Sequence, residues 1–386
     1  MQERKRVVFI DYLRVIACLM VMTIHSCEPF YLGGEAPNVT FFASRMDALW
    51  VTLVECLCRS CVPLFMMASS YLLFPVTKPT GDFLRRRIAR VAIPFLVWTC
   101  AYVWWFNDSW GKVCFNFPDA GGHLWFVPML LGIYLLMPLI SPWAERVSRS
   151  ELLGWIALWL ATTTFPYLRR IWSALYGNPS FGAVPYLYGE CPWNMFGAFH
   201  YVSGFVGYLL VGFWFRRFCP EMTWRRTLAI SVPLWLAGVS MIGCGFYFRI
   251  PSFPYSAPYS AAVDLEMSIE YCSTGVALTS IAAFMLLRKL DAETWLYRNV
   301  IRHLAKASYG TYLLHMFVLL AVFGAIRPHC PTPVTIAATA ISSFALASLA
   351  SILIGRIPKL GRRICGSLRR CVSNRRAPCR GAGPSS

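Results

Sequence analysis

The chain has 386 residues, of which 57% are hydrophobic and only 14% are charged, whereas soluble domains carry about 25% charged residues. This composition excludes an ordinary soluble protein and assigns most of the chain to a lipid bilayer. In a soluble protein the formal charge of +18 would suggest a nucleic-acid partner. Here the basic residues lie between hydrophobic segments, as in membrane proteins, so we expect no nucleic acid as a partner.

Ten segments have the apolar character of membrane-spanning helices. A span needs roughly 20 apolar residues, because every backbone amide in hydrocarbon must be bonded within the segment. The segments are Val8–Cys27, Ala48–Phe74, Val91–Phe106, His123–Trp143, Leu152–Phe165, Phe199–Phe215, Leu228–Phe248, Tyr271–Leu290, Ser308–Ile326 and Ile336–Ile357. The third and fifth are short by this measure. The predicted fold is all-α, a polytopic bundle of about ten transmembrane helices.

The distribution of basic residues predicts the orientation. If the N-terminus is cytoplasmic, 28 Lys and Arg lie in cytoplasmic segments, six lie outside, and Arg14 and Arg59 lie within helices. Cytoplasmic loops carry the excess of Lys and Arg, so both termini are predicted to be cytoplasmic. We expect a multi-pass protein of the plasma (inner) membrane. Because the first segment is of full helix length and lacks a small-residue cleavage pattern, we expect it to be retained.

The domain organisation follows from the same pattern. Residues 1–360 are predicted to form one membrane-embedded domain. The basic residues 361–386, rich in Gly, Ser and Pro, are predicted to form a disordered cytoplasmic tail on anionic headgroups. The longest outer stretch, Pro166–Ala198, has about 33 residues, too few for a soluble catalytic domain of ordinary size. The chemistry is therefore expected inside the bundle.

Ionisable residues within the first segment are candidates for function, since such groups are costly in a membrane. Asp11, Arg14 and His25 all lie there. The eleven-residue step from Arg14 to His25 leaves them about 20° apart around a helix and about 16 Å apart along it. This stripe indicates a passage from a cytoplasmic donor to an outer acceptor. The alternative has equal weight: Arg14 reaches the headgroups and His25 caps the helix.

The second segment carries Glu55 and Arg59, which are four residues apart and share a helix face. Arg59 is predicted near the membrane midplane, where a charge pair kept only for packing is expensive. We favour a role for Arg59 in the active cavity, with mutual neutralisation as the alternative. Cys56, Cys58 and Cys61 lie close by, but no second ligand cluster accompanies them, so no metal is expected.

Two further groups stand out along the chain. Arg85, Arg86, Arg87 and Arg90 precede the third segment, and the guanidinium forks of Arg87 and Arg90 share one face. Such forks suit the phosphates of a nucleotide such as coenzyme A, although an ordinary cytoplasmic anchor explains the cluster nearly as well.

The ninth segment contains Ser308, Tyr309, Tyr312 and His315. His315 lies two turns after Ser308 and faces the same side. A lone His in an apolar helix is more often structural than catalytic, so His315 ranks below His25.

Five motifs, in order, resemble acyltransferase family 3, the bacterial integral-membrane acyltransferases that modify surface glycans. Asp11-x-x-Arg14-x-x-Ala17 with His25 resembles the opening D-x-x-R-x-x-A and its His. Arg59-x-x-Val-Pro-Leu-Phe65 resembles the second-helix R-x-x-V-P-L-F; beyond it Ser69 is retained, but Ser70 replaces a Gly. The other three motifs are Arg87-x-x-Arg90 with Pro94, His123-Leu-Trp-Phe126 with Tyr134 and Pro138, and Ser308-x-x-x-Tyr-Leu-x-His315.

The resemblance implies an acyl-CoA donor, with acetyl-CoA expected, and a sugar hydroxyl as acceptor, on a lipid-linked or exported glycan. It also implies an essential His in the first helix and an Arg pair that handles the donor. We assign His25 as the base and Arg59 to the oxyanion or acceptor, with His315 and Ser308 in support. Arg14, Arg87 and Arg90 hold the donor phosphates and Asp11 orients Arg14. Glycan-assembly proteins are further expected partners.

Two other functions compete with this interpretation. A secondary transporter also suits ten helices with buried charges, but Glu55 is the only deeply placed carboxylate and no internal repeat is evident. A non-catalytic partner in glycan export is the second alternative, and such a protein would tolerate loss of His25.

Overall fold

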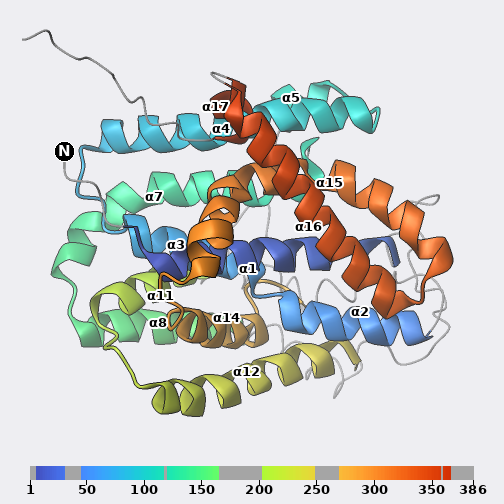
Figure 1. The fold of residues 1–386 in the computed structure, drawn as a ribbon. Helices are drawn as coiled ribbons and strands as arrows, with labels where there is room; N and C mark the ends of the chain where they lie inside the picture. Colours follow the sequence, from blue (N-terminus) through green and yellow to red (C-terminus); the bar gives the residue numbers. More distant parts are fainter. Residues whose placement is uncertain are drawn as a thin grey trace, which may run out of the picture.

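The computed structural model describes residues 6–30, 45–116, 120–164, 202–247, 269–357 and 360–366. These residues form a bundle in which most helices run roughly along one direction and α16 crosses them obliquely (Figure 1). The helices are α1 (Val8–His25), α2 (Arg45–Cys58), α3 (Cys61–Leu73), α4 (Thr80–Trp105), α5 (Gly111–Phe115), α7 (Phe126–Arg146), α8 (Arg149–Thr163), α11 (Val206–Arg217), α12 (Trp224–Tyr247), α14 (Thr274–Leu287), α15 (Arg302–Ile326), α16 (Thr332–Arg356) and α17 (Leu360–Cys365). Short helical turns are η1 (Glu28–Phe30), η2 (Gly122–Leu124), η3 (Tyr297–Ile301) and η4 (Arg327–His329).

The predicted all-helical, polytopic fold is confirmed. Each of the ten predicted segments contains helix in the described chain, and seven helical stretches are long and apolar enough to cross a membrane. The remaining three predicted segments correspond to α8, α11 and α14, which have 15, 12 and 14 residues. The count of ten spans stays a prediction. The third segment, short by sequence, is the 26-residue α4, since its arginine-rich approach is also helical.

The second predicted helix is not continuous, which corrects the sequence-based boundaries. Helix α2 ends at Cys58 and α3 begins at Cys61, so Arg59 and Ser60 form a break. Pro63 explains the interruption, because it has no amide hydrogen to bond the carbonyl of Arg59 and is tolerated only in the first turn of a new helix. The break places the Arg59 side chain beside a loop rather than on a helix surface.

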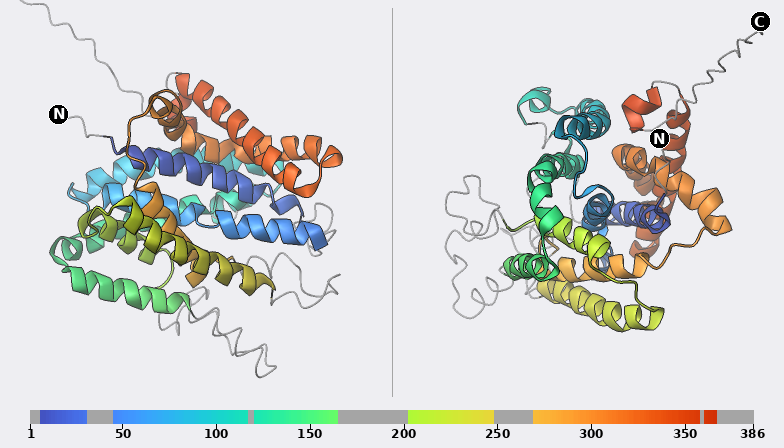
Figure 2. Two further views of the ribbon diagram at one scale, coloured as in Figure 1. Left: turned by 60° about the horizontal axis from the view of Figure 1, so that its bottom comes forward. Right: turned by 90° about the vertical axis from the view of Figure 1, so that its left-hand side faces the viewer.

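Helix α1 occupies the middle of the bundle. It contacts α2, α3, α14, α15 and α16, and the two views of Figure 2 show it surrounded by other helices. Its buried side chains include Leu13, Ala17, Cys18 and Met22. Large apolar side chains are exposed on peripheral helices such as α4, α12 and α16, as expected where the solvent is lipid. The central position of α1 brings its polar residues into the protein interior.

The contact between α3 and α11 accounts for Ser70, which stands where the motif that the second segment resembles has Gly. The Ser70 hydroxyl donates to the carbonyl of Leu209 at 2.5 Å, so the small polar side chain ties the two helices together. The glycine that allows α3 and α11 to approach closely lies on α11 instead, at Gly212. A Cβ at Gly212 would lie 2.6 Å from the Met67 carbonyl oxygen and 2.8 Å from the Ser70 Cβ.

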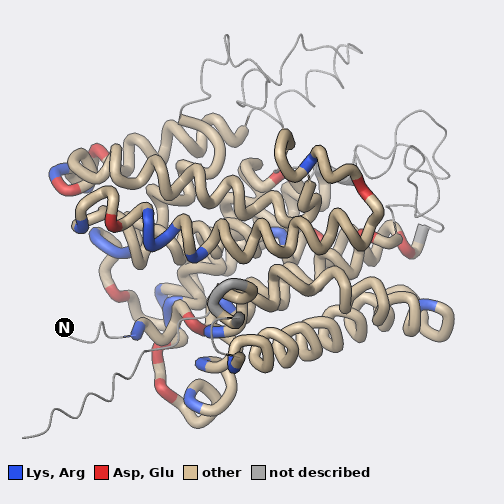
Figure 3. The backbone as a smooth tube through the Cα atoms, turned by 90° about the horizontal axis from the view of Figure 1, so that it is seen from above, with Lys and Arg blue, Asp and Glu red and all other residues tan. Residues whose placement is uncertain are grey.

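Charge is unevenly distributed along the bundle. Lys and Arg gather toward the end where the N-terminus lies (Figure 3), as the predicted orientation requires. At this end α17 contacts α4, α15 and α16. The first residues of the predicted tail, Gly361 to Gly366, therefore have a defined structure. The long stretch Pro166–Ala198 lies outside the described residues.

Candidate active site

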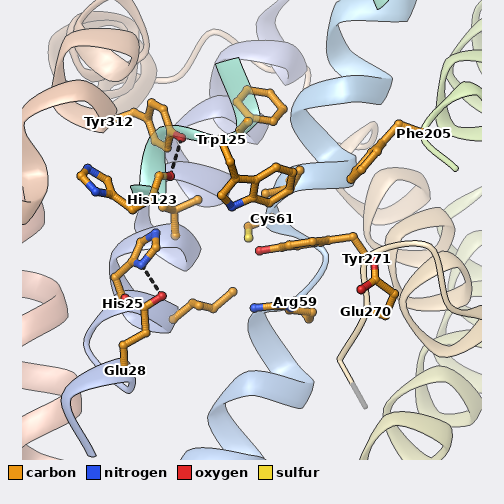
Figure 4. Close-up of a pocket in the computed structure, with 14 residues that line it drawn as sticks. His25, Glu28, Arg59, Cys61, His123, Trp125, Phe205, Glu270, Tyr271 and Tyr312 are labelled. Atoms are coloured by element: carbon orange, nitrogen blue, oxygen red, sulfur yellow. Dashed lines mark hydrogen bonds and ion pairs between the residues drawn. The ribbon is translucent and has the colours of Figure 1, made fainter. Parts of the chain in front are cut away.

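A cavity of about 290 Å³ opens beside the end of α1 that lies farther from the N-terminus (Figure 4). Its walls come from α1, α3, α7, α15 and the segments before α7, α11 and α14. The lining residues are Val21, Ile24, His25, Glu28, Arg59, Cys61, Val62, His123, Trp125, Phe126, Phe205, Glu270, Tyr271 and Tyr312. Two of the predicted catalytic residues, His25 and Arg59, thus meet in one cavity.

His25 is the last residue of α1, and it pairs with a carboxylate. Pro29, in η1, cannot supply the amide hydrogen that would bond the His25 carbonyl and continue the α-helix. The turn brings Glu28 back beside the imidazole, with Nδ1 of His25 2.7 Å from Oε1 of Glu28 (Figure 4). Because a carboxylate only accepts, Nδ1 carries a proton, and in the neutral imidazole the lone pair is then on Nε2. This arrangement suits a general base.

Two further histidines lie next to His25. The ring centroid of His315 is 4.9 Å from that of His25 and 5.1 Å from that of His123. His315 is fully buried, and its Nδ1 donates to the Tyr312 carbonyl at 2.5 Å. Within the described part of the chain, Nε2 of His123 and of His315 have no hydrogen-bond partner. His315 therefore contacts the His25 ring from the protein interior and does not itself line the cavity.

Local structure also fixes His123. Gly122 has φ +49°, a left-handed conformation that glycine adopts without strain, and it allows the chain to turn through η2 into α7. The hydroxyl of Tyr312 donates to the His123 carbonyl at 3.0 Å. Tyr312 is thus hydrogen-bonded to both neighbouring histidines, through the backbone carbonyl of His123 and the ring Nδ1 of His315.

Arg59 lies across the cavity from His25 (Figure 4). Its Nε donates to the Ile269 carbonyl at 2.8 Å, and Nη1 is 3.4 Å from Oε2 of the fully buried Glu55. The guanidinium also stacks on Tyr271, 4.1 Å from the ring centroid. These contacts hold a positive charge in place before any substrate binds, which is the requirement for stabilising developing negative charge.

Aromatic rings form the wall on the Arg59 side. The centroid of Trp125 lies 5.3 Å from that of Tyr271 and 6.0 Å from that of Phe205. Glu270 also lines the cavity at this wall. The combination of ring faces with a carboxylate and a guanidinium offers both apolar contact and hydrogen bonding to a polar ligand.

The arginines predicted to bind the donor gather near the other end of α1. Arg14 interacts electrostatically with Arg87, and Arg90 interacts with both. Nε of Arg90 donates to the Gly366 carbonyl at 3.1 Å. The structure therefore brings together three guanidinium groups from α1 and α4. Like charges repel, so their clustering favours a polyanionic ligand such as a phosphate group.

Asp11 and Ser308 are placed differently from what their predicted roles suggest. Asp11 accepts hydrogen bonds from the Arg6 side chain and, at 2.9 Å, from the Tyr297 hydroxyl. It attracts Arg14 electrostatically, but its described hydrogen bonds join the start of α1 to η3. The Ser308 hydroxyl donates to the Ala305 carbonyl at 3.1 Å, and Ser308 does not line the cavity.

Sequence reasoning missed several lining residues. Glu28 carries a local signal, since it lies three residues after His25, a spacing that brings side chains together in a helical turn. Glu270, Tyr271 and Phe205 carry no such signal, because only tertiary packing brings them to the first helix. In the described ranges no cluster of three or more His, Cys, Asp or Glu has the geometry to hold a metal ion.

Comparison with known proteins agrees with this architecture. The model of the acyltransferase domain of acyltransferase family 3 matches residues 7–353, nearly the whole bundle. No curated protein and no solved structure matches the chain. The matched region contains the histidine cavity and the arginine cluster. The chain therefore belongs to the acyltransferase 3 family and is an acyltransferase with the helices of a multi-pass membrane protein.

Proposed function

We propose that the protein is an O-acyltransferase of the plasma membrane that moves an acyl group, preferentially acetyl, from cytoplasmic acyl-CoA to a hydroxyl of a cell-surface or lipid-linked glycan. The observation that carries this proposal is the pairing of two sites on α1. A His25–Glu28 dyad faces a cavity at one end, and three arginines gather near the other end. Family membership favours this function over the transporter and the non-catalytic partner.

The dyad supplies the base. Nε2 of His25 takes the proton of the acceptor hydroxyl. The hydroxyl oxygen attacks the thioester carbonyl at the same time, which forms a tetrahedral oxyanion. The carbon–sulfur bond then breaks, and the His25 imidazolium returns the proton to the departing thiolate. The products are the ester and free coenzyme A. Glu28 keeps the ring in the productive tautomer and stabilises the imidazolium, as a carboxylate does beside a catalytic histidine.

Arg59 stabilises the oxyanion or orients the acceptor. Its contacts with Ile269, Glu55 and Tyr271 hold the guanidinium at the cavity wall. A charge held in place in this way is effective, because little reorganisation accompanies the reaction. The buried ring of His315 packs against the His25 ring and holds it in position.

Donor and acceptor reach the cavity from opposite sides. Arg14, Arg87 and Arg90 hold the phosphates of acyl-CoA, and the pantetheine arm extends along α1 over the separation of about 16 Å between Arg14 and His25. Trp125, Tyr271 and Phe205 offer ring faces to the apolar face of a sugar, while Glu270 and Arg59 hydrogen-bond its hydroxyl edge. Glycan-assembly proteins in the same membrane would deliver the acceptor.

Transfer of radiolabelled acetyl from acetyl-CoA tests the proposal. The purified protein in proteoliposomes is given labelled acetyl-CoA and a lipid-linked saccharide extract, and alkali-labile label in the saccharide fraction is measured. We expect transfer with the native chain and background label with His25→Ala. Equal labelling by both proteins, or none with any acyl-CoA or saccharide, would contradict the proposal.

A further inference from the structure

Helix α17 lies beside the arginine cluster and outside the matched family region, which ends at residue 353. Figure 1 shows it against α4. Two carbonyls of this C-terminal segment accept hydrogen bonds from α4: the Gly366 carbonyl from Nε of Arg90 at 3.1 Å, and the Ile364 carbonyl from Nε1 of Trp98 at 2.8 Å. The segment is thus attached to the helix that carries Arg87 and Arg90.

The fit of the segment is close on both sides. Cys365 is buried against α15, where a Cβ at Gly310 would come within 2.9 Å of Cys365 Cβ and Sγ. Gly366 has φ +61°, and a Cβ there would lie 3.0 Å from the Tyr309 ring and 3.1 Å from the Arg90 carbonyl oxygen. A side chain at either glycine would push the segment away. Glycine at both positions allows the Gly366 carbonyl to reach Arg90.

The contact constrains Arg90 without occupying its terminal groups. Only Nε bonds the Gly366 carbonyl, and within the described chain the two terminal amino groups of Arg90 have no hydrogen bond. These are the groups that form a fork with phosphate oxygens. Arg14 and Arg87 repel Arg90, and the fixed carbonyl dipole of Gly366 beside Nε offsets part of that repulsion.

We propose that α17 and Gly366 are a positioning element of the donor site, which holds the Arg90 guanidinium ready for the phosphates of acyl-CoA. This inference rests on the proposed function, since it assumes that the cluster binds the donor. Trp98 fastens the element to α4, and Gly310 provides the space in which Cys365 packs. The donor site is incomplete without a segment beyond the matched family region.

Two shortened chains separate the element from the basic residues that follow it. One ends at Gly366 and lacks only residues 367–386, with their five arginines; the other ends at Ile357 and also lacks α17. Binding of coenzyme A is measured by titration calorimetry on protein in nanodiscs. Ending the chain at Ile357 should raise the Kd roughly 3- to 10-fold over ending it at Gly366, the range of one hydrogen bond.

A point substitution guards against misfolding of the shorter chain. Trp98→Phe keeps the ring but removes the N–H bonded to Ile364, and we expect the Kd to rise by roughly 2- to 5-fold. Trp104→Phe on the same helix, at an exposed position, is the matched control and should leave the Kd unchanged. If α17 acts through Arg90, removing it from an Arg90→Ala protein should cause no further loss.

Three results would contradict the positioning role of α17. Equal affinity in both shortened chains and in Trp98→Phe would overturn the positioning role, and so would tighter binding without α17, which would make the segment an inhibitory cover. Additive losses with Arg90→Ala would also contradict it. If the native chain binds no coenzyme A at all, the proposed donor itself is wrong. The titration of the native chain thus distinguishes failure of the proposed function from failure of the positioning role.

Discussion

The two ends of α1 hold their charged groups in different ways. At the cavity end, side chains pair with one another: His25 with Glu28, and Arg59 with Glu55. At the other end, Arg14, Arg87 and Arg90 repel each other, and the described hydrogen bond of Arg90 goes to a backbone carbonyl. At one end each of these side chains has a side-chain partner before substrate arrives, and the other end gathers positive charge.

Under the proposed function, this difference separates chemistry from binding. A paired His25–Glu28 dyad keeps its geometry in the empty enzyme, as a general base requires. A cluster of like charges is stabilised by a polyanion, so it favours the bound state of a phosphate-bearing donor. Substitutions at the cavity end should therefore lower turnover, and those at the arginine end should weaken donor affinity. The following predictions test this separation, beginning with the largest expected effect.

His25→Ala should remove turnover while leaving donor affinity intact. General-base contributions are about 10²- to 10⁴-fold, so we expect a loss of this size or larger in the rate of acetyl transfer. Coenzyme A affinity should remain near that of the native protein, because Arg14 lies about 16 Å away along the helix. Transfer assays and titrations on one preparation measure both.

His315→Ala is the matched control for this change. It should reduce turnover less than His25→Ala, since His315 packs behind the cavity. If His315→Ala loses all transfer and His25→Ala keeps most of it, the base is on α15 and the assignment is reversed.

Glu28→Gln should lower kcat by about 10²-fold with little change in the KM for the donor, because the neutral amide neither fixes the tautomer of His25 nor stabilises its imidazolium. Glu28→Asp, which keeps the charge, should retain more activity. Steady-state kinetics of both variants measure the effect. A raised donor KM with unchanged kcat in Glu28→Gln would break the proposed separation of the two ends.

Arg87→Ala combined with Arg90→Ala should weaken coenzyme A binding by at least about 10- to 100-fold, since even one hydrogen bond to a charged group is worth about 1.5–3 kcal/mol. Membrane insertion should be intact. Arg85→Ala with Arg86→Ala removes the same charge from the preceding turn and should weaken binding far less. If the two double variants had the same Kd for coenzyme A, Arg87 and Arg90 would be an ordinary cytoplasmic anchor.

Gly212→Ala should affect stability rather than either site specifically. The added methyl would overlap the Met67 carbonyl oxygen at 2.6 Å and force α3 and α11 apart, at a cost of about 1–3 kcal/mol. Gly132→Ala in α7, where nothing lies within 4 Å of the added Cβ, is the control. Thermal unfolding of both proteins in detergent should show a lower midpoint for Gly212→Ala alone.

Much of the architecture could be predicted without a structure. Long apolar segments must be helices in a membrane, because no other arrangement of a single segment satisfies its backbone groups. Helical periodicity likewise placed Arg14 and His25 on one face of α1 and Glu55 beside Arg59. These inferences depend on residues close together in the chain, and they are the ones that the structure reproduces.

Tertiary structure decided what lies opposite each of these groups. Pro63 interrupts the predicted second helix, and the break turns Arg59 toward Ile269 and Tyr271, more than 200 residues later. His123 in η2 and His315 in α15 both lie next to His25, and the three rings form a triangle with centroids 4.9–6.1 Å apart. The predicted tail supplies a carbonyl to Arg90. Such contacts depend on which helix faces meet, and local spacing contains no information about that choice.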